Sequence, residues 1–129
     1  MKNVTELVNG YIATWNETDS KRRLELIAET WSEDGSYVDA HRSGTGHENI
    51  SAMIQSVQEQ LPGYRLQLAS VVDAHNNRVR FQWKAGGTVE APLRFVGTDF
   101  GYIATDGRLE SITGFLDEAP GLPAKKEHE

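Results

Sequence analysis

The sequence predicts an α+β fold in which three helices precede a mainly antiparallel sheet. Apolar residues recur with the helical period of about 3.6 before Gly63 and with the strand period of two after it. Helices and antiparallel strands that are segregated along the chain are typical of this class. We expect the sheet to wrap around the helices to bury its apolar face, which leaves a pocket at the open end.

Two amphipathic helices begin the chain. The first starts at Val4, and its apolar stripe comprises Val4, Leu7, Val8, Tyr11, Ile12 and Trp15. For the second, the side chains of 18–20 offer N-cap oxygens, and Gly35 follows its end. Its expected buried positions are Leu24, Ile27, Ala28 and Trp31.

A short strand at 36–39 and a loop at 40–44 separate the second helix from the third. The spacing from Thr45 to Glu48 predicts a capping box at the start of the third helix. We expect that helix to end at Pro62-Gly63 and to bury Ile50, Met53, Ile54, Val57 and Leu61.

The remaining chain predicts two hairpins. Alternating runs at 66–72 and 79–85 flank Asn76-Asn77, and asparagine tolerates the positive φ of a tight turn. A strand over 91–104, the turn signal Asp106-Gly107 and a strand through Ile112, Phe115 and Leu116 follow. We expect one domain over 1–117 and a polar tail over 118–129.

Composition excludes several classes of function. The 129 residues fit one domain, and the lack of cysteine excludes disulfides and cysteine-based metal or redox sites. With 19 acidic and 13 basic residues the net charge is −6, which argues against a nucleic-acid partner. No apolar run reaches the roughly 20 residues that span a bilayer. The N-terminal residues lack the apolar region of a signal peptide, so we expect a cytoplasmic protein.

Three polar residues stand at positions that suggest chemistry. Tyr11 lies on the apolar stripe of the first helix, Asp39 ends the short strand, and Asp99 interrupts an apolar row between Gly97 and Gly101. Glycines beside a carboxylate can leave room for a ligand. The alternatives are a core tyrosine, a turn carboxylate or ion pair of Asp39 with Arg42, and a bulge that turns Asp99 to solvent.

A phenol and two carboxylates in unlike environments suit proton transfer next to a carbonyl. An ionised carboxylate removes the proton, while a phenol and a buried, neutral carboxylic acid stabilise the oxyanion. We expect His41 to orient or titrate beside Asp39, unless it is an exposed loop residue. Asp39, His41 and His47 could supply metal ligands, but their spacing is poor, so we expect neither metal nor cofactor.

The chain resembles the NTF2-like superfamily, in particular its SnoaL-like and ketosteroid-isomerase-like members. The resemblance rests on GYIATWN at 10–16, WSEDGSYVD at 31–39, GTGHENI at 44–50 and GTDFGYIATDGRL at 97–109. It implies a cone of three helices against a curved sheet, an apolar cavity and a homodimer formed through the outer sheet face.

The resemblance also implies roles for individual residues. Tyr11 falls on the oxyanion-binding tyrosine of ketosteroid isomerases, Asp39 on their general base, and Asp99 on their protonated aspartate, a pairing known from that enzyme. Two departures are Ala40, where the isomerases have proline, and Arg42, a cation beside the base. An opposite charge weakens a carboxylate as a base.

The leading hypothesis is a protein that binds a small, apolar, carbonyl-bearing molecule and moves a proton on it, as isomerase, cyclase or dehydratase. Asp39 would be the base, Tyr11 and Asp99 the oxyanion donors, and His41 an accessory group. The candidate wall residues are Trp15, Tyr37, Phe81, Trp83, Phe95 and Phe115. The alternatives are a binding module without chemistry and a structural subunit whose cavity is filled by side chains.

Overall fold

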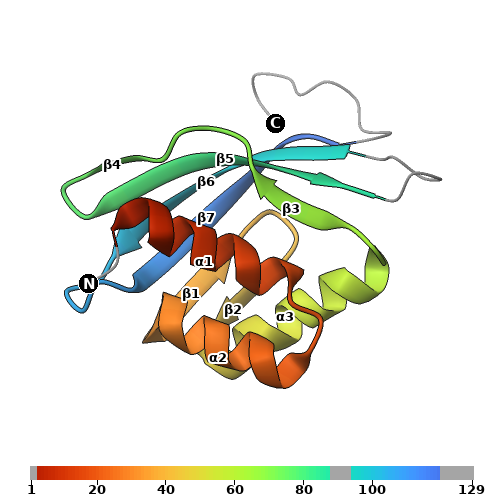
Figure 1. Cartoon of the computed structure of the whole chain (residues 1–129), viewed down its shortest axis with the longest axis horizontal. Coiled ribbons are helices and arrows are strands. Elements are labelled where there is room, and N and C mark those ends of the chain that lie inside the picture. The colour runs from red at the N-terminus through yellow and green to blue at the C-terminus, as the bar shows by residue number, and fades with distance from the viewer. Residues whose placement is uncertain (1–2, 88–93, 120–129) are drawn as a thin grey trace.

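Three helices cover one face of a seven-stranded sheet in the computed structural model, which describes residues 3–87 and 94–119 (Figure 1). The helices are α1 (Val4–Asn16), α2 (Ser20–Thr30) and α3 (His47–Gln60). The strands are β1 (Trp31–Val38), β2 (Ser43–Thr45), β3 (Arg65–Leu68), β4 (Asp73–His75), β5 (Arg78–Gly86), β6 (Arg94–Ile103) and β7 (Leu109–Glu118). The predicted α+β class is confirmed.

The sheet is mixed, with the order β2-β1-β7-β6-β5-β3 and β4 beside β5. All pairs are antiparallel except β1 with β7, which run parallel up to the pair Val38 and Thr113. The long strands β5, β6 and β7 form its centre. Because the first strand, β1, pairs with the last strand, β7, the segment that follows Val38 lies next to the C-terminal part of β7.

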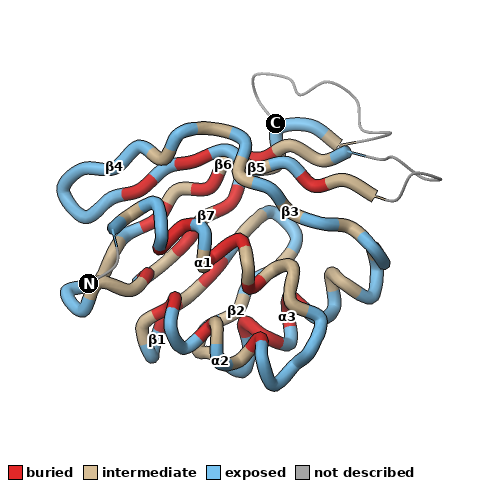
Figure 2. The backbone as a smooth tube through the Cα atoms, in the orientation of Figure 1, coloured by how far each residue is buried: buried red, intermediate tan, exposed pale blue. Residues whose placement is uncertain are grey.

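The core lies between the helices and the inner face of the sheet, where the buried segments of the backbone face one another (Figure 2). The α1 stripe is confirmed: Leu7, Val8, Tyr11 and Ile12 are buried, and Val4 and Trp15 are partly buried. The side chain of Asn3 caps α1 by accepting from the Glu6 N–H at 2.8 Å. The helical period therefore places Tyr11 inside the molecule.

The prediction for the second helix is correct in part: Ile27 and Trp31 are buried and Leu24 is partly buried, but the helix ends at Thr30. Helix α2 buries Arg23, Ile27 and Thr30, while Ala28 is exposed and Trp31 begins β1. The guanidinium of Arg23 donates to the Ser51 hydroxyl, the Glu17 carbonyl, and the side-chain oxygens of Gln55 and Gln58, at 2.9 to 3.0 Å. These acceptors compensate for the burial of the Arg23 charge. The side chain of Arg23 can therefore face inward from α2.

The predicted capping box at Thr45 to Glu48 is wrong. Thr45 belongs to β2, which pairs with β1, so part of the predicted loop at 40–44 is a strand as well. The N-cap of α3 is Gly46 with φ of 85°, and no side chain caps it. In α3, Ile50, Met53 and Ile54 are buried, whereas Val57 and Leu61 are only partly buried.

The turns that were predicted from sequence are confirmed. Asn76 and Asn77 have φ of 49° and 62° between β4 and β5, and Gly107 has φ of 86° between β6 and β7. The predicted strand at 66–72 is interrupted after Leu68.

Strand β7 extends to Glu118. Residues 88–93 and 120–129 lie outside the described residues, and they include part of the predicted 91–104 strand and most of the predicted tail. Within the described ranges, no helix has the length and hydropathy that crossing a membrane requires.

Candidate functional site

An inner cavity of about 310 Å³ lies between the helices and the concave side of the sheet. Its apolar lining comes from α1, α3 and the strands: Trp15, Val57, Leu61, Leu66, Trp83, Ala85, Phe95, Phe115, Leu116 and Ala119. Its polar lining comprises Tyr11, Tyr37, Asp39, His41, Arg42 and Asp99. This volume and lining are typical of small-molecule sites, which combine apolar walls with a few polar groups.

Asp99 lies at the centre of the sheet, with 1% of its surface exposed. In β6 it pairs with Phe81 on one side and Gly114 on the other. The Tyr11 hydroxyl donates to Oδ2 at 2.6 Å, and the Trp83 indole N–H donates to Oδ1 at 2.9 Å. The register of β6 against β7 shifts between Val96 and Gly97, but Asp99 still faces inward, so the alternative that a bulge turns it to solvent is wrong.

Burial raises the pKa of Asp99 to about 6, with a further upward effect of the negative charges of Asp39 and Asp117. The hydrogen bonds from Tyr11 and Trp83 oppose this rise because they stabilise the carboxylate. The pKa of the Tyr11 phenol is raised well above its ordinary value, first by burial and then by the charge of Asp99. Asp99 can therefore exchange a proton near neutral pH, while Tyr11 remains a proton donor.

The flanking glycines leave room above Asp99, but protein atoms occupy it. A Cβ at Gly97 would collide with the Trp83 indole, and one at Gly101 with the Ser111 carbonyl. Gly97 therefore allows the indole to cross the strand and reach Asp99. The expectation that these two glycines leave space for a ligand is wrong for this reason.

Asp39 accepts four hydrogen bonds. Tyr37 Oη and Arg42 Nη1 each lie 2.7 Å from Oδ2, and the backbone N–H groups of His41 and Arg42 donate to Oδ1 at 2.8 and 3.0 Å. The carboxylate is 12% exposed and forms the ion pair with Arg42 that the sequence left as an alternative. Asp39 thus organises the tight loop at 39–42, where its own N–H donates to the Arg42 carbonyl.

Gly114 separates the two carboxylate groups and was missed in the sequence. A Cβ at this position would lie 2.8 Å from Tyr37 Oη, 2.9 Å from Asp99 Oδ1 and 3.5 Å from Asp39 Cβ. The missing side chain therefore allows the Tyr37 hydroxyl and the Asp99 carboxylate to lie close to the backbone of β7. Its signal in the sequence is a glycine in the inward-facing row of β7, between Ile112 and Leu116.

The cavity brings together most of the predicted site residues. Tyr11, Asp39, His41 and Asp99 line it, as do Trp15, Tyr37, Trp83, Phe95 and Phe115. Phe81 is not among its lining residues: it is buried in the core, with its ring edge-on to Tyr11 at 5.5 Å between centroids. Phe115 lies at the rim and is 57% exposed. His41 is exposed and contacts Asp39 through its backbone.

The proposed metal ligands do not converge. The His47 Nε2 lies 3.0 Å from the carbonyl oxygens of Trp31 and Ser32, so this ring stabilises the start of β1. Over residues 3–87 and 94–119, no group of three histidine, aspartate or glutamate side chains has the arrangement of a metal site.

Comparisons with known proteins agree with this architecture. Residues 8–112 match the model of the SnoaL-like domain. A candidate isomerase of the SnoaL-like family from Agrobacterium tumefaciens is 37% identical, with a TM-score of 0.83 over 88% of this chain and 97% of that one. A search of curated proteins found no match.

Two more distant structures share the fold. A candidate SnoaL-like polyketide cyclase from a Jannaschia species is 15% identical, with a TM-score of 0.68 over 91% of this chain and 90% of that one. An NTF2-like protein from an Exiguobacterium species is 17% identical, with a TM-score of 0.70 over 88% and 99%. The fold is that of an NTF2-like protein. Within this superfamily, the chain belongs to the SnoaL-like family.

Proposed function

We propose that this protein is a cofactor-independent enzyme that moves a proton on a small, mainly apolar carbonyl compound, and that Asp99 is its acid–base group. The observation that carries the proposal is a carboxylic acid, Asp99, that is hydrogen-bonded to Tyr11 at the wall of an apolar cavity and whose burial raises its pKa to about 6. The kinship with a candidate isomerase and a candidate polyketide cyclase supports the same class of chemistry.

In the proposed reaction, the Asp99 carboxylate removes a proton from the carbon next to the carbonyl group. The C–H electron pair forms an enolate, whose negative oxygen needs a hydrogen-bond donor. Once protonated, Asp99 can donate to Tyr11 across the same 2.6 Å contact, which frees the Tyr11 O–H for the enolate oxygen. Return of the proton from Asp99 to a different carbon gives isomerisation. Attack of the enolate carbon on a second carbonyl gives cyclisation, and the alkoxide that forms takes the proton from Asp99.

We propose a positioning role for Asp39 in place of the general-base role that the resemblance implies. Its two oxygens already accept four hydrogen bonds, one of which is the ion pair with Arg42, so these partners hold the carboxylate in place. Asp39 also holds the Tyr37 hydroxyl, which forms part of the cavity wall. A loss of Asp39 should therefore disturb the mouth of the cavity more than the proton transfer.

Hydrogen–deuterium exchange tests the proposal without knowledge of the natural substrate. α-Tetralone and β-tetralone are bicyclic ketones that carry exchangeable hydrogens next to the carbonyl, and proton NMR in D₂O measures their loss. We expect the wild type to accelerate exchange of at least one ketone, and Asp99→Asn to reduce that acceleration about 100-fold or more. Asp39→Asn should have a smaller effect, and Asp34→Asn, at an exposed position in β1, should have none.

Two results would contradict this assignment. If Asp39→Asn loses more exchange than Asp99→Asn, Asp39 is the base, as in ketosteroid isomerases. If the wild type binds the ketones without accelerating exchange, the protein is a binding module. A binding module without catalysis is compatible with the hydrogen bonds that Tyr11 and Trp83 donate to the two oxygens of Asp99.

We also propose that the protein is a homodimer formed through the outer face of the sheet. Tyr102, in β6, is 39% exposed there, stacks edge-on with Phe100 and lies under the Arg78 guanidinium at 5.1 Å. Side chains of this kind are enriched at interfaces. Sedimentation should give a dimer for the wild type and a monomer for Tyr102→Asp; a monomeric wild type would refute the proposal.

A further inference from the structure

The proposed reaction leaves the enolate oxygen with one hydrogen-bond donor, the Tyr11 phenol. Oxyanion sites in proteins combine several donors that are oriented before the reaction begins. Asp99 cannot be the second donor in this scheme, because it is the base and shares its proton with Tyr11 across the 2.6 Å contact. A second donor must therefore come from elsewhere on the cavity wall.

The described lining of the inner cavity offers few candidates for this second donor. Besides the carboxyl groups and the loop at 39–42, the side chains with an N–H or O–H group are Tyr11, Trp15, Tyr37 and Trp83. The Tyr11 phenol and the Trp83 indole both donate to Asp99. The Tyr37 phenol donates to Asp39 at 2.7 Å. Of these four groups, the indole N–H of Trp15 is the one that remains.

The indole nitrogen of Trp15 is buried and has no hydrogen-bond partner in the described parts of the chain. A buried donor without an acceptor lowers the stability of a protein. Native proteins contain few such groups, and a catalytic role is one reason for keeping one. Trp15 lines the inner cavity, so a ligand there can supply the acceptor.

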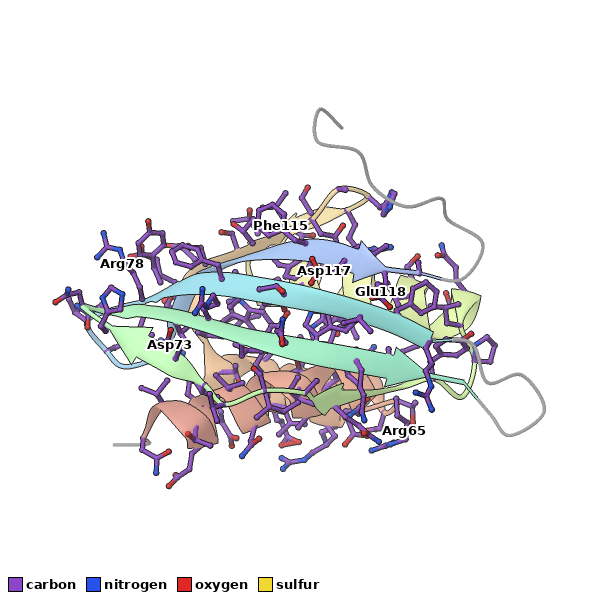
Figure 3. The ribbon with its side chains drawn as sticks, turned by 90° about the horizontal axis from the view of Figure 1, so that it is seen from above. Arg65, Asp73, Arg78, Phe115, Asp117 and Glu118 are labelled. Atoms are coloured by element: carbon purple, nitrogen blue, oxygen red, sulfur yellow. The ribbon has the colours of Figure 1, made fainter. Side chains whose placement is uncertain are left out.

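Charged side chains on the other face of the sheet do not reach this site. Arg78 of β5 and Asp117 of β7 are exposed and belong to the outward rows of their strands. Figure 3 shows the sheet from this side, with both residues labelled. Helix α1 packs on the opposite face, and Trp15 lies in its last turn. A donor for the ligand is therefore available from the helix side of the cavity.

Trp15 and Tyr11 lie four residues apart on α1, so their side chains are neighbours on one face of the helix. Their rings meet edge-on with 6.4 Å between centroids, and the Trp15 ring lies edge-on to Tyr37 at 5.3 Å. Burial and the charge of Asp99 raise the pKa of the Tyr11 phenol, and the nearby indole N–H of Trp15 opposes this rise. The indole N–H thus lies close to the phenol, although no hydrogen bond joins the two.

We propose that the indole N–H of Trp15 and the phenol of Tyr11 together bind the carbonyl oxygen of the ligand. This inference rests on the proposed function, which supplies the carbonyl group and the enolate. As the enolate forms, negative charge builds up on this oxygen, and both hydrogen bonds become stronger. Trp15 is then a further catalytic residue. The two oxyanion donors come from one helix, and the base, Asp99, comes from the sheet.

Nuclear magnetic resonance of protein labelled with ¹⁵N in the indole rings tests the contact directly. The chain has three tryptophans, and Trp15 is identified by nuclear Overhauser contacts of its N–H with the rings of Tyr11 and Tyr37. The probes are α-tetralone and tetralin, the hydrocarbon with the same two rings and no oxygen. We expect α-tetralone to move the Trp15 N–H proton signal downfield, because the proton enters a hydrogen bond, and tetralin to leave it without such a shift.

The signal of Trp31 is the internal control of this measurement. Its ring is buried in the core, its N–H lies 3.4 Å from the Ser36 carbonyl oxygen, and it does not line the cavity. It should stay in place with either probe.

Equilibrium dialysis of the same probes separates the N–H of Trp15 from its ring. Trp15→Phe removes the N–H and part of the ring surface, and the loss of surface affects both probes alike. We expect the variant to weaken α-tetralone about 3- to 10-fold more than tetralin. At saturating ketone it should reduce hydrogen–deuterium exchange at least about 10-fold.

Tyr64→Phe is the matched control. The Tyr64 hydroxyl is also buried without a partner among the described residues, but Tyr64 does not line the cavity. Its loss should change neither the two affinities nor the exchange. The inference is overturned if the Trp15 signal is the same with α-tetralone and with tetralin bound, or if Trp15→Phe weakens both probes equally.

These outcomes separate the inference from the proposed function. Exchange that depends on Asp99, together with an unmoved Trp15 signal, refutes the role of Trp15 alone. A Trp15 signal that moves downfield with α-tetralone, together with no exchange, refutes the enzymatic function and leaves Trp15 as a binding residue. If α-tetralone does not bind the wild type, β-tetralone takes its place; if neither ketone binds, both proposals are refuted.

Discussion

Replacement of Asp99 by asparagine should stabilise the protein at neutral pH while it removes activity. Asparagine has nearly the same shape, and it can accept from the Trp83 indole and donate to the Tyr11 oxygen, the two partners that Asp99 has in the structure. It cannot ionise. The variant therefore avoids a buried negative charge that the wild type must carry above the pKa of Asp99.

The magnitude follows from the pKa of Asp99. The rise from 3.8 to about 6 corresponds to about 3 kcal/mol of folding free energy. Because the folded state raises this pKa, the protonated form is the one that the fold favours. Stability from this group is fully present below pH 3.8, decreases as the pH rises to about 6, and stays low above it. At pH 8 the variant should gain up to about 3 kcal/mol, or about 10 °C in Tm.

Urea denaturation of wild type and Asp99→Asn at pH 4, 6 and 8 measures this gain. The difference in unfolding free energy should be below about 1 kcal/mol at pH 4 and should increase through pH 6. Asp34→Asn, at an exposed position, should stay within about 0.5 kcal/mol of the wild type throughout. A difference between wild type and Asp99→Asn that does not change with pH, or a variant that is less stable at pH 8, would refute the reasoning.

The remaining predictions concern Gly114, the Tyr11 phenol and the buried guanidinium of Arg23. Gly114→Ala should cost about 1 to 3 kcal/mol in urea denaturation and should weaken tetralone binding, because its methyl group would press on Asp99 Oδ1 and Tyr37 Oη. Tyr11→Phe should reduce ketone exchange at least 10-fold, because the enolate loses its donor; unchanged exchange would exclude that role. Arg23→Met should lower the unfolding free energy by about 2 kcal/mol with exchange per folded molecule unchanged, and no loss of stability would show that the four hydrogen bonds contribute little.

Periodicity was sufficient to predict the inward-facing residues of the regular elements. The helical spacing from Val4 places Tyr11 in the core, and the strand period of two places Asp99 on the inner face of β6. Both predictions depend only on local geometry, since the side-chain direction is fixed by the type of element.

The contacts that define the chemistry depend on residues far apart in the sequence. The pairing of β5 with β6 opposes Trp83 to Gly97, and only this register explains how the indole reaches Asp99. The buried position of Arg23 depends on Gln55 and Gln58 of α3, more than 30 residues away. An arginine in isolation indicates a solvent-facing position, so Arg23 was missed, although Ile27 was correctly predicted to be buried.

Because β1 pairs with β7, the segment that bounds the entrance of the cavity is different from the strand that carries Asp99. Asp99 lies in a central strand that is paired on both sides, so its position is fixed by the core. The entrance is bounded instead by the four-residue connection at 39–42, which joins β1 to β2 at the end of the sheet order. Insertions in such connections leave the elements they join intact. A change of this connection would therefore alter the entrance of the cavity while the buried Asp99 and its partners stay in place.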